Sequence, residues 1–330
     1  MPIIEVKNLS KTYDYYRKKA GVKASFLSLF KREKSFTEAV KDISFSINEG
    51  ELVGFLGPNG AGKTTTLKML SGILHPTSGS AEVLGFVPWH RQSEYQKQFA
   101  LVMGQKNQLW PDLPAMESFI LNSEIYEIPN DEFKKNLDEL IELLGIREIL
   151  EVPVRKLSLG QRMKCELVAA LLHKPKVLFL DEPTIGLDVV AQKNIRDFIK
   201  KYNREKKTTI IITSHYMEDI KELCDRVIII DHSRIIYDDR LAELINRYAP
   251  LKKLTITFNN SGVTKEQAGE FGPIHEFSPY KVSFEIDRAL VKETAARILS
   301  SDLPVDDIMI DEIDITEVVR KIFKTVPTKL

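Results

Sequence analysis

One glycine-rich segment has the residue types and spacing to hold a phosphate chain. Its glycines can turn backbone N–H groups toward a β-phosphate, and a helix that begins near Lys63 adds the positive end of its dipole. The segment reads Gly57-Pro58-Asn59-Gly60-Ala61-Gly62-Lys63-Thr64, followed by Thr65, and matches G-x-x-x-x-G-K-[ST] at every fixed position. We therefore predict ATP binding here, with Lys63 on the β and γ oxygens and Thr64 as a ligand of Mg²⁺. The alternative is an ordinary glycine turn with a surface lysine.

Two adjacent carboxylates form a second reactive element. Asp181 and Glu182 directly follow the apolar run 177–180, which has the length of a buried strand. We expect Asp181 to hold Mg²⁺ through water. Glu182 would orient and polarise the attacking water, a general-base role worth about 10² to 10⁴ in rate. The alternative, a solvated acidic loop, is disfavoured by the neighbouring phosphate-binding pattern.

The elements that would position these residues follow an α/β pattern. Four short apolar runs have strand length and end in polar residues, which is typical of parallel strands with a site at their carboxyl ends. They are residues 51–56, 177–180, 209–212 and 227–230. Between residues 114 and 173 strand signals give way to helical spacing, so we predict an inserted helical subdomain there.

Leu157-Ser158-Leu159-Gly160-Gln161 narrows the class of nucleotide-binding protein. It precedes a helix-like run and resembles the signature of ABC ATPases, usually written LSGGQ, with Leu159 in place of the first glycine. Residues 6–239 resemble the ATPase domain of ABC transporters. This resemblance implies a P-loop core with an N-terminal antiparallel β region. It also implies a head-to-tail dimer, in which the signature, residues Ser158, Leu159, Gly160 and Gln161, closes on the partner's ATP.

Four further residues acquire roles from this resemblance. Gln105 matches the Q-loop that reaches Mg²⁺, Asp188 matches the D-loop at the dimer interface, and His215 matches the switch histidine on the γ-phosphate. Tyr13 matches the aromatic residue that stacks on adenine, although two neighbouring tyrosines compete for that role. Taken singly, each of these residues could instead be structural.

The composition limits location and partners. Lys+Arg and Asp+Glu both number 47, so nothing attracts the chain to nucleic acid. Cys165 and Cys224 lack metal-like spacing and indicate buried thiols of a reducing compartment. The N-terminus does not resemble a signal peptide, and no run approaches the ~20 apolar residues of a membrane span. We expect a peripheral subunit on the cytoplasmic face of the membrane, with the permease on another polypeptide.

Two regions lie outside the ATPase pattern. Residues 14–36 form an insertion with seven basic residues among apolar ones, which could contact anionic lipid or be a solvated loop. We divide the chain into an ATPase domain, residues 1–247, and a small α+β domain, residues 248–330. The second domain is expected to contain strands at 251–258, 281–286 and 305–310 and helices at 288–300 and 316–323.

The segments 103–114 and 156–164 resemble bacterial exporters of the drug and polysaccharide kind, whose permease is a separate protein. The predicted function is therefore ATP hydrolysis by a homodimer, or by a pair with a paralogue, that powers export of a cargo the sequence does not identify. One alternative is a soluble ABC ATPase of translation or chromosome maintenance. Another is a regulator that binds ATP without hydrolysing it, which Glu182 and His215 disfavour.

Overall fold

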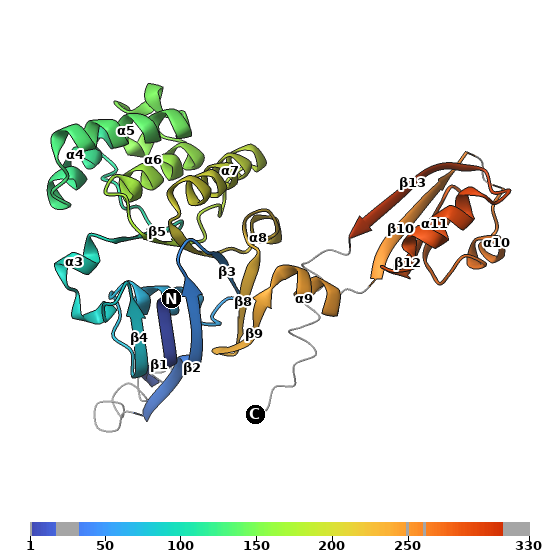
Figure 1. Ribbon diagram of the computed structural model, residues 1–330, viewed down its shortest axis with the longest axis horizontal. Coiled ribbons are helices and arrows are strands. Elements are labelled where there is room, and N and C mark those ends of the chain that lie inside the picture. The colour runs from blue at the N-terminus through green and yellow to red at the C-terminus, as the bar shows by residue number, and fades with distance from the viewer. Residues whose placement is uncertain (1, 18–32, 249–250, 260–261, 313–330) are drawn as a thin grey trace, which may run out of the picture. The chain divides into compact units, whose positions relative to one another are not determined.

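The chain folds into two compact units, Met1–Asp239 and Arg240–Leu330. The computed structural model describes residues 2–17, 33–248, 251–259 and 262–312 (Figure 1). The helix α9 (Leu241–Tyr248) belongs to the second unit, so the predicted domain boundary after residue 247 falls inside this helix.

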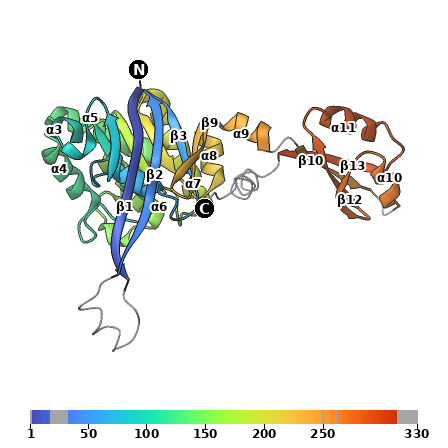
Figure 2. The same ribbon diagram turned by 90° about the horizontal axis from the view of Figure 1, so that it is seen from below.

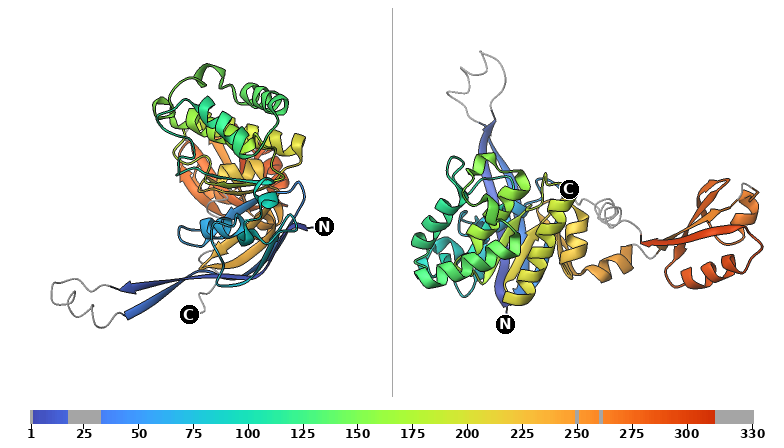
Figure 3. Two further views of the ribbon diagram at one scale, coloured as in Figure 1. Left: turned by 90° about the vertical axis from the view of Figure 1, so that its left-hand side faces the viewer. Right: turned by 90° about the horizontal axis from the view of Figure 1, so that it is seen from above.

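The first unit begins with an antiparallel sheet of three strands in the order β2-β1-β4. The strands are β1 (Pro2–Arg17), β2 (Glu33–Asn48) and β4 (Ser78–Val83). β1 and β2 run side by side as a long ribbon (Figures 2 and 3), and Asp14–Arg17 pair with Glu33–Phe36. The two ends of the predicted insertion 14–36 are therefore strands, whereas its residues 18–32 lie outside the described part of the chain.

A sheet of six strands in the order β5-β6-β7-β3-β8-β9 forms the centre of this unit. Its strands are β3 (Leu52–Leu56), β5 (Phe99–Met103), β6 (Val177–Asp181), β7 (Thr209–Thr213), β8 (Arg226–Asp231) and β9 (Arg234–Arg240). The strands β5, β6, β7, β3 and β8 are parallel. Every residue of β3, β6 and β7 is buried, as expected for strands covered on both faces. The four predicted strands are confirmed.

Helices pack against this sheet: α2 (Lys63–Leu70), α3 (Ser93–Gln96), α7 (Val189–Lys206) and α8 (Met217–Leu223). A short 3₁₀ turn, Pro88–His90, contacts α2 and β4. Because β3, β6 and β7 are parallel neighbours, their carboxyl ends meet at one edge of the sheet. The loops that carry the predicted reactive residues begin at this edge.

The predicted helical subdomain is also confirmed. It contains α4 (Ala115–Ile125), α5 (Asn130–Leu144), α6 (Leu159–Leu171) and the 3₁₀ turns Arg147–Ile149 and Val154–Lys156. In α5, Leu137, Leu140 and Leu144 are buried at helical spacing, and Gly145 ends the helix with a φ of 60°. Figure 1 shows α4, α5 and α6 packed together beyond β5.

The second unit contains an antiparallel sheet in the order β11-β12-β10-β13. The strands are β10 (Leu251–Phe258), β11 (Ile274–Ser278), β12 (Lys281–Asp287) and β13 (Val305–Glu312). Besides α9, the unit has the helices α10 (Lys265–Gly269) and α11 (Val291–Leu299). Leu254, Ile256 and Phe284 are fully or almost fully buried and lie in the core of this unit. The predicted helix 316–323 lies outside the described residues.

The structure also bears on the predictions made for the two cysteines and for membrane-spanning segments. Both thiols are buried and free, and burial raises the pKa of Cys165 to about 12, as expected for unreactive structural thiols. Within the described residues, no helix combines the length and apolar character that crossing a bilayer requires.

Candidate active site

The glycine-rich segment connects β3 to α2 and surrounds a buried ammonium group. Lys63 Nζ donates hydrogen bonds to the carbonyl oxygens of Gly57, at 2.7 Å, and Pro58, at 3.1 Å. Gly62 has a φ of 111°, and a Cβ there would lie 2.4 Å from the Ala39 carbonyl oxygen, so this position requires glycine. Burial lowers the pKa of Lys63, and the charges of Glu182 and Asp181 oppose that effect. An anion at the loop would give this ammonium a partner of opposite charge.

Asp181 lies at the end of β6 and is held from both sides by hydroxyl groups. Its Oδ2 accepts from Thr64 Oγ1 at 2.8 Å, and its Oδ1 accepts from Thr213 Oγ1 at 2.7 Å. Thr213 was not predicted from the sequence, although it is a polar residue at the end of an apolar run. Carboxylate and hydroxyl oxygens are ligands that Mg²⁺ accepts, so the pair Thr64 and Asp181 fits that ion chemically.

The carboxylate of Glu182 is clamped between two loops. Its Oε1 lies 2.6 Å from His215 Nε2, and its Oε2 accepts from Gln105 Nε2 at 2.7 Å. A Cβ at Gly104 would lie 2.0 Å from the Glu182 carbonyl oxygen, so glycine allows the Gln105 loop to approach. Glu182 itself has a φ of 56°, a left-handed conformation that is uncommon for residues other than glycine. The structure thus brings together three residues that are far apart in sequence and predicted to act on the same reaction.

The signature residues form the start of α6. Ser158 Oγ accepts from the Gln161 backbone N at 3.2 Å, and Gln161 Oε1 accepts from the Ser158 backbone N at 2.9 Å. Together these bonds form a capping box in which the serine oxygen is an acceptor, which leaves its hydroxyl proton free to donate. In the described part of the chain, no hydrogen bond joins Ser158 or Gly160 to Lys63, Asp181 or Glu182.

The replacement of glycine by Leu159 has a visible packing consequence. Leu159 Cδ2 would lie 3.1 Å from a Cβ added at Gly186, so this side chain is directed toward the predicted D-loop of the same chain. A Cβ at Gly160 would lie 2.9 Å from Ala191 Cβ, which explains the need for glycine at the second position. Leu159 therefore packs against its own chain at this point.

Two other predicted site residues have local roles in the structure. Asp188 is the N-cap of α7, and its Oδ1 accepts from the Ala191 backbone N at 2.8 Å. Tyr13 lies on β1 opposite Thr37 and is 38% exposed, and the Lys11 ammonium is 5.4 Å from its ring centroid. The predicted roles of Asp188 at a dimer interface and of Tyr13 on adenine remain predictions.

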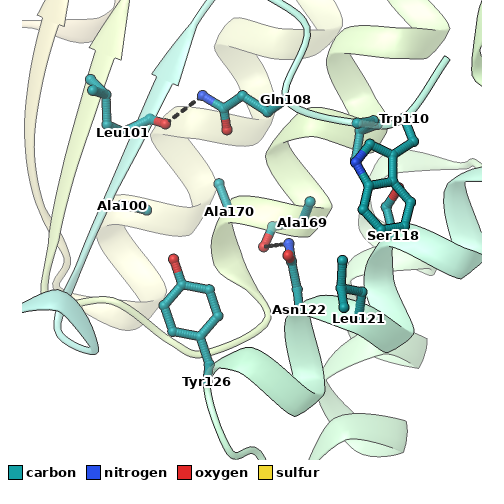
Figure 4. Close-up of a pocket in the computed structure, with 11 residues that line it drawn as sticks. Ala100, Leu101, Gln108, Trp110, Ser118, Leu121, Asn122, Tyr126, Ala169 and Ala170 are labelled. Atoms are coloured by element: carbon teal, nitrogen blue, oxygen red, sulfur yellow. Dashed lines mark hydrogen bonds between the residues drawn. The ribbon is translucent and has the colours of Figure 1, made fainter. Parts of the chain in front are cut away.

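A separate pocket of about 150 Å³ lies between the loop that carries Gln108 and Trp110 and the helices α4 and α6 (Figure 4). Gln108 closes one side, and its Nε2 donates to the Leu101 carbonyl oxygen at 2.7 Å. Ser118, from α4, is buried, and its hydroxyl has no hydrogen-bond partner within the described part of the chain, whereas Trp110 is 51% exposed. The wall of the pocket thus combines the loop that follows Gln105 with residues of the helical subdomain.

Comparison with known proteins places both units among transporter proteins. A family described as ABC transporter matches residues 40–185, and one described as EvrA-like ABC transporter, C-terminal domain, matches residues 250–311. The ABC transporter ATP-binding protein NatA of Bacillus subtilis is 36% identical over 215 residues, which are 65% of this chain and 87% of NatA.

Two further similar proteins are also ATP-binding proteins or parts of ABC transporters. The linearmycin resistance ATP-binding protein LnrL of Bacillus subtilis is 38% identical over 63% of this chain and 66% of LnrL. The solved structure of cbiO1 from Clostridium perfringens, part of the ABC transporter complex cbiONQ, is 26% identical, with a TM-score of 0.60. That likeness covers 76% of this chain and 96% of cbiO1.

Proposed function

Because the chain belongs to the ABC transporter ATP-binding protein family, we propose that two copies of it hydrolyse ATP to power export through a separate permease. A pair with a paralogue would serve the same purpose. The observation that carries this proposal is the clamped Glu182 carboxylate beside the buried ammonium of Lys63. The matching families and relatives are transporter proteins, so the alternative of a translation or chromosome factor finds no support in them.

Each member of the cluster has a chemical role in this proposal. Lys63 and the backbone N–H groups of the glycine-rich loop bind the β- and γ-phosphates. Glu182 accepts a proton from the attacking water, while His215 and Gln105 fix the orientation of its carboxylate. Thr64 and Asp181 would hold Mg²⁺, which neutralises charge on the phosphates.

The second half of the site comes from the other copy. Among the residues that the structure describes, the Ser158 hydroxyl donates its proton to no acceptor. The first turn of α6 also has backbone N–H groups that its own helix cannot pair. Together they form an anion site suited to a γ-phosphate. We therefore place Ser158 and Gly160 of one copy on the ATP held by the other.

We propose that the permease binds to the apolar surface that includes Trp110, at the rim of the pocket of Figure 4, and extends over the helix α4. Four apolar side chains of this surface are more than a third exposed, as expected where a protein partner binds: Trp110, Leu113, Ile120 and Ile125. The loop from Gln105 to Trp110 connects this surface to Glu182, so a partner bound there could sense the state of the nucleotide. The proposal places the chain on the cytoplasmic face of the membrane, because ATP is supplied there.

The test of this function is capture from detergent-solubilised membranes of the source organism with the tagged chain. A polytopic membrane protein should be retained, and Trp110→Glu should weaken that retention because it places a charge in the apolar contact. Ile73→Glu is the matched control, since Ile73 is similarly exposed, at 48%, but follows α2. Retention of ribosomal or chromosomal complexes in place of a membrane protein would contradict the proposal.

The basic insertion gives a second prediction, concerning lipid contact. Deletion of residues 17–34 should leave ATPase activity intact, because none of the clustered site residues lies in that segment. It should weaken binding to vesicles that contain anionic lipid, since each basic residue near such a surface contributes up to about 1 kcal/mol. Vesicle co-sedimentation at low and high salt measures this. Equal binding by the deleted and full-length chains would identify the segment as a solvated loop.

A further inference from the structure

Asp219 in α8 is a buried carboxylate that no part of the reaction described above uses. It is 0% exposed, and its Oδ2 accepts two hydrogen bonds of 2.5 Å, from Thr184 Oγ1 and Ser214 Oγ. Its Oδ1 accepts from Arg196 Nη1 at 3.0 Å, and Arg196 is only 5% exposed. Asp219 therefore has three partners on three different segments of the chain.

The two hydroxyl partners belong to the loops that carry the catalytic pair. Thr184 follows Glu182 in the loop after β6, and Ser214 directly precedes His215 at the end of β7. Ser214 Oγ also accepts from the Tyr216 backbone N at 2.9 Å, which fixes the backbone on the other side of His215. One oxygen atom of Asp219 thus links the loop of Glu182 to the loop of His215.

The need to balance the buried charge of Arg196 does not explain the contacts of Asp219. Arg196 Nε already pairs with Glu222 Oε2 at 2.8 Å, so a second carboxylate is available to that guanidinium. Burial acts to lower the pKa of Arg196, but the hydrogen bonds with Asp219 and Glu222 outweigh burial, and the pKa is raised. Arg196, which lies on α7, holds Oδ1 of Asp219, and this leaves Oδ2 of Asp219 for the hydroxyls of Thr184 and Ser214.

We propose that Asp219 is a positioning residue that sets the distance between His215 Nε2 and Glu182 Oε1 by fastening both loops to α8. This inference rests on the proposed roles of Glu182 and His215 in hydrolysis. It requires no contact between Asp219 and the nucleotide. Its loss should therefore change the rate of the chemical step and leave ATP binding unchanged.

The most direct test removes one hydroxyl at a time. Thr184→Val keeps the shape of the side chain but loses the bond to Asp219, and we expect kcat to fall about tenfold, with KM and equilibrium ATP binding unchanged. Thr184→Ser keeps the hydroxyl and should restore most of kcat. Ser214→Ala should resemble Thr184→Val, and Asp219→Asn should cost up to about 10²-fold, the size expected from small misplacements of reacting groups.

Glu222→Gln is the control, because it weakens the anchoring of Arg196 without touching either loop. It should lower the thermal unfolding temperature more than it lowers kcat. Wild-type kcat in folded Thr184→Val and Ser214→Ala, with hydrolysis abolished in Glu182→Gln, would overturn this inference alone. Equal loss of kcat in Thr184→Val and Thr184→Ser would also overturn it. A wild-type rate in Glu182→Gln would overturn the proposed catalytic role and this inference with it.

Discussion

Substitution of Glu182 by glutamine is expected to lower kcat for ATP hydrolysis by about 10² to 10⁴ while ATP binding stays in the wild-type range. The amide has nearly the same shape as the carboxylate but cannot accept the proton of the attacking water. Lys63, Thr64 and Asp181 are unchanged, so the contacts proposed for phosphate and Mg²⁺ remain. The bound ATP is then not consumed, and the variant should accumulate as an ATP-bound dimer.

Two measurements check this expectation. Phosphate release under Mg²⁺-ATP gives kcat, and sedimentation with and without Mg²⁺-ATP gives the dimer fraction. Glu139→Gln is a suitable control, because its pairing with Lys206 is at the surface and such a pair contributes at most about 1 kcal/mol. An unchanged rate of phosphate release in Glu182→Gln would remove Glu182 from the catalytic role.

The central elements of the fold could be predicted because each has a strong local pattern. The runs that become β3, β6 and β7 are apolar throughout, since both faces of the sheet are covered. The helix α10 and the strand β11 were missed. The first has only five residues, too few to display a helical period, and the second is a short edge strand, IHEFS, with mixed polarity.

The candidate site was predictable where its residues follow strands. Parallel neighbours bring Lys63, Asp181 and His215 to one edge of the sheet, so their proximity follows from the order of strands. Thr213 was not predicted, because every predicted strand ends in polar residues and the sequence does not show which of them contacts Asp181. Asp219 was not predicted, because a single buried aspartate has no distinguishing pattern. Their roles depend on contacts between segments that are distant in sequence, which only the folded chain reveals.

Leu159 shows a different limit of sequence reasoning. A leucine in place of glycine suggests a restriction on the approach of the nucleotide. In the structure its side chain is directed toward Gly186 of its own chain, and the Ser158 hydroxyl proton remains available. The orientation of this side chain could not be read from the residue type alone.

The second large effect concerns the sharing of one ATP site between two chains. Lys63→Ala removes the ammonium that is proposed to bind phosphate, and Ser158→Arg blocks the signature with a bulky charge. Each variant alone should be nearly inactive. If Ser158 acts on the partner's ATP, a mixed dimer of the two variants contains one intact composite site and one doubly damaged site.

The ATPase rate of an equal mixture of Lys63→Ala and Ser158→Arg chains decides whether one ATP site is shared between two chains. With random pairing, about a quarter of the wild-type rate should return, because half the dimers are mixed and each has one intact site. A mixture of Lys63→Ala with Glu182→Gln is the control and should stay inactive, since both changes damage the same half of the site. A rate for the first mixture equal to the sum of the separate variants would contradict the shared site.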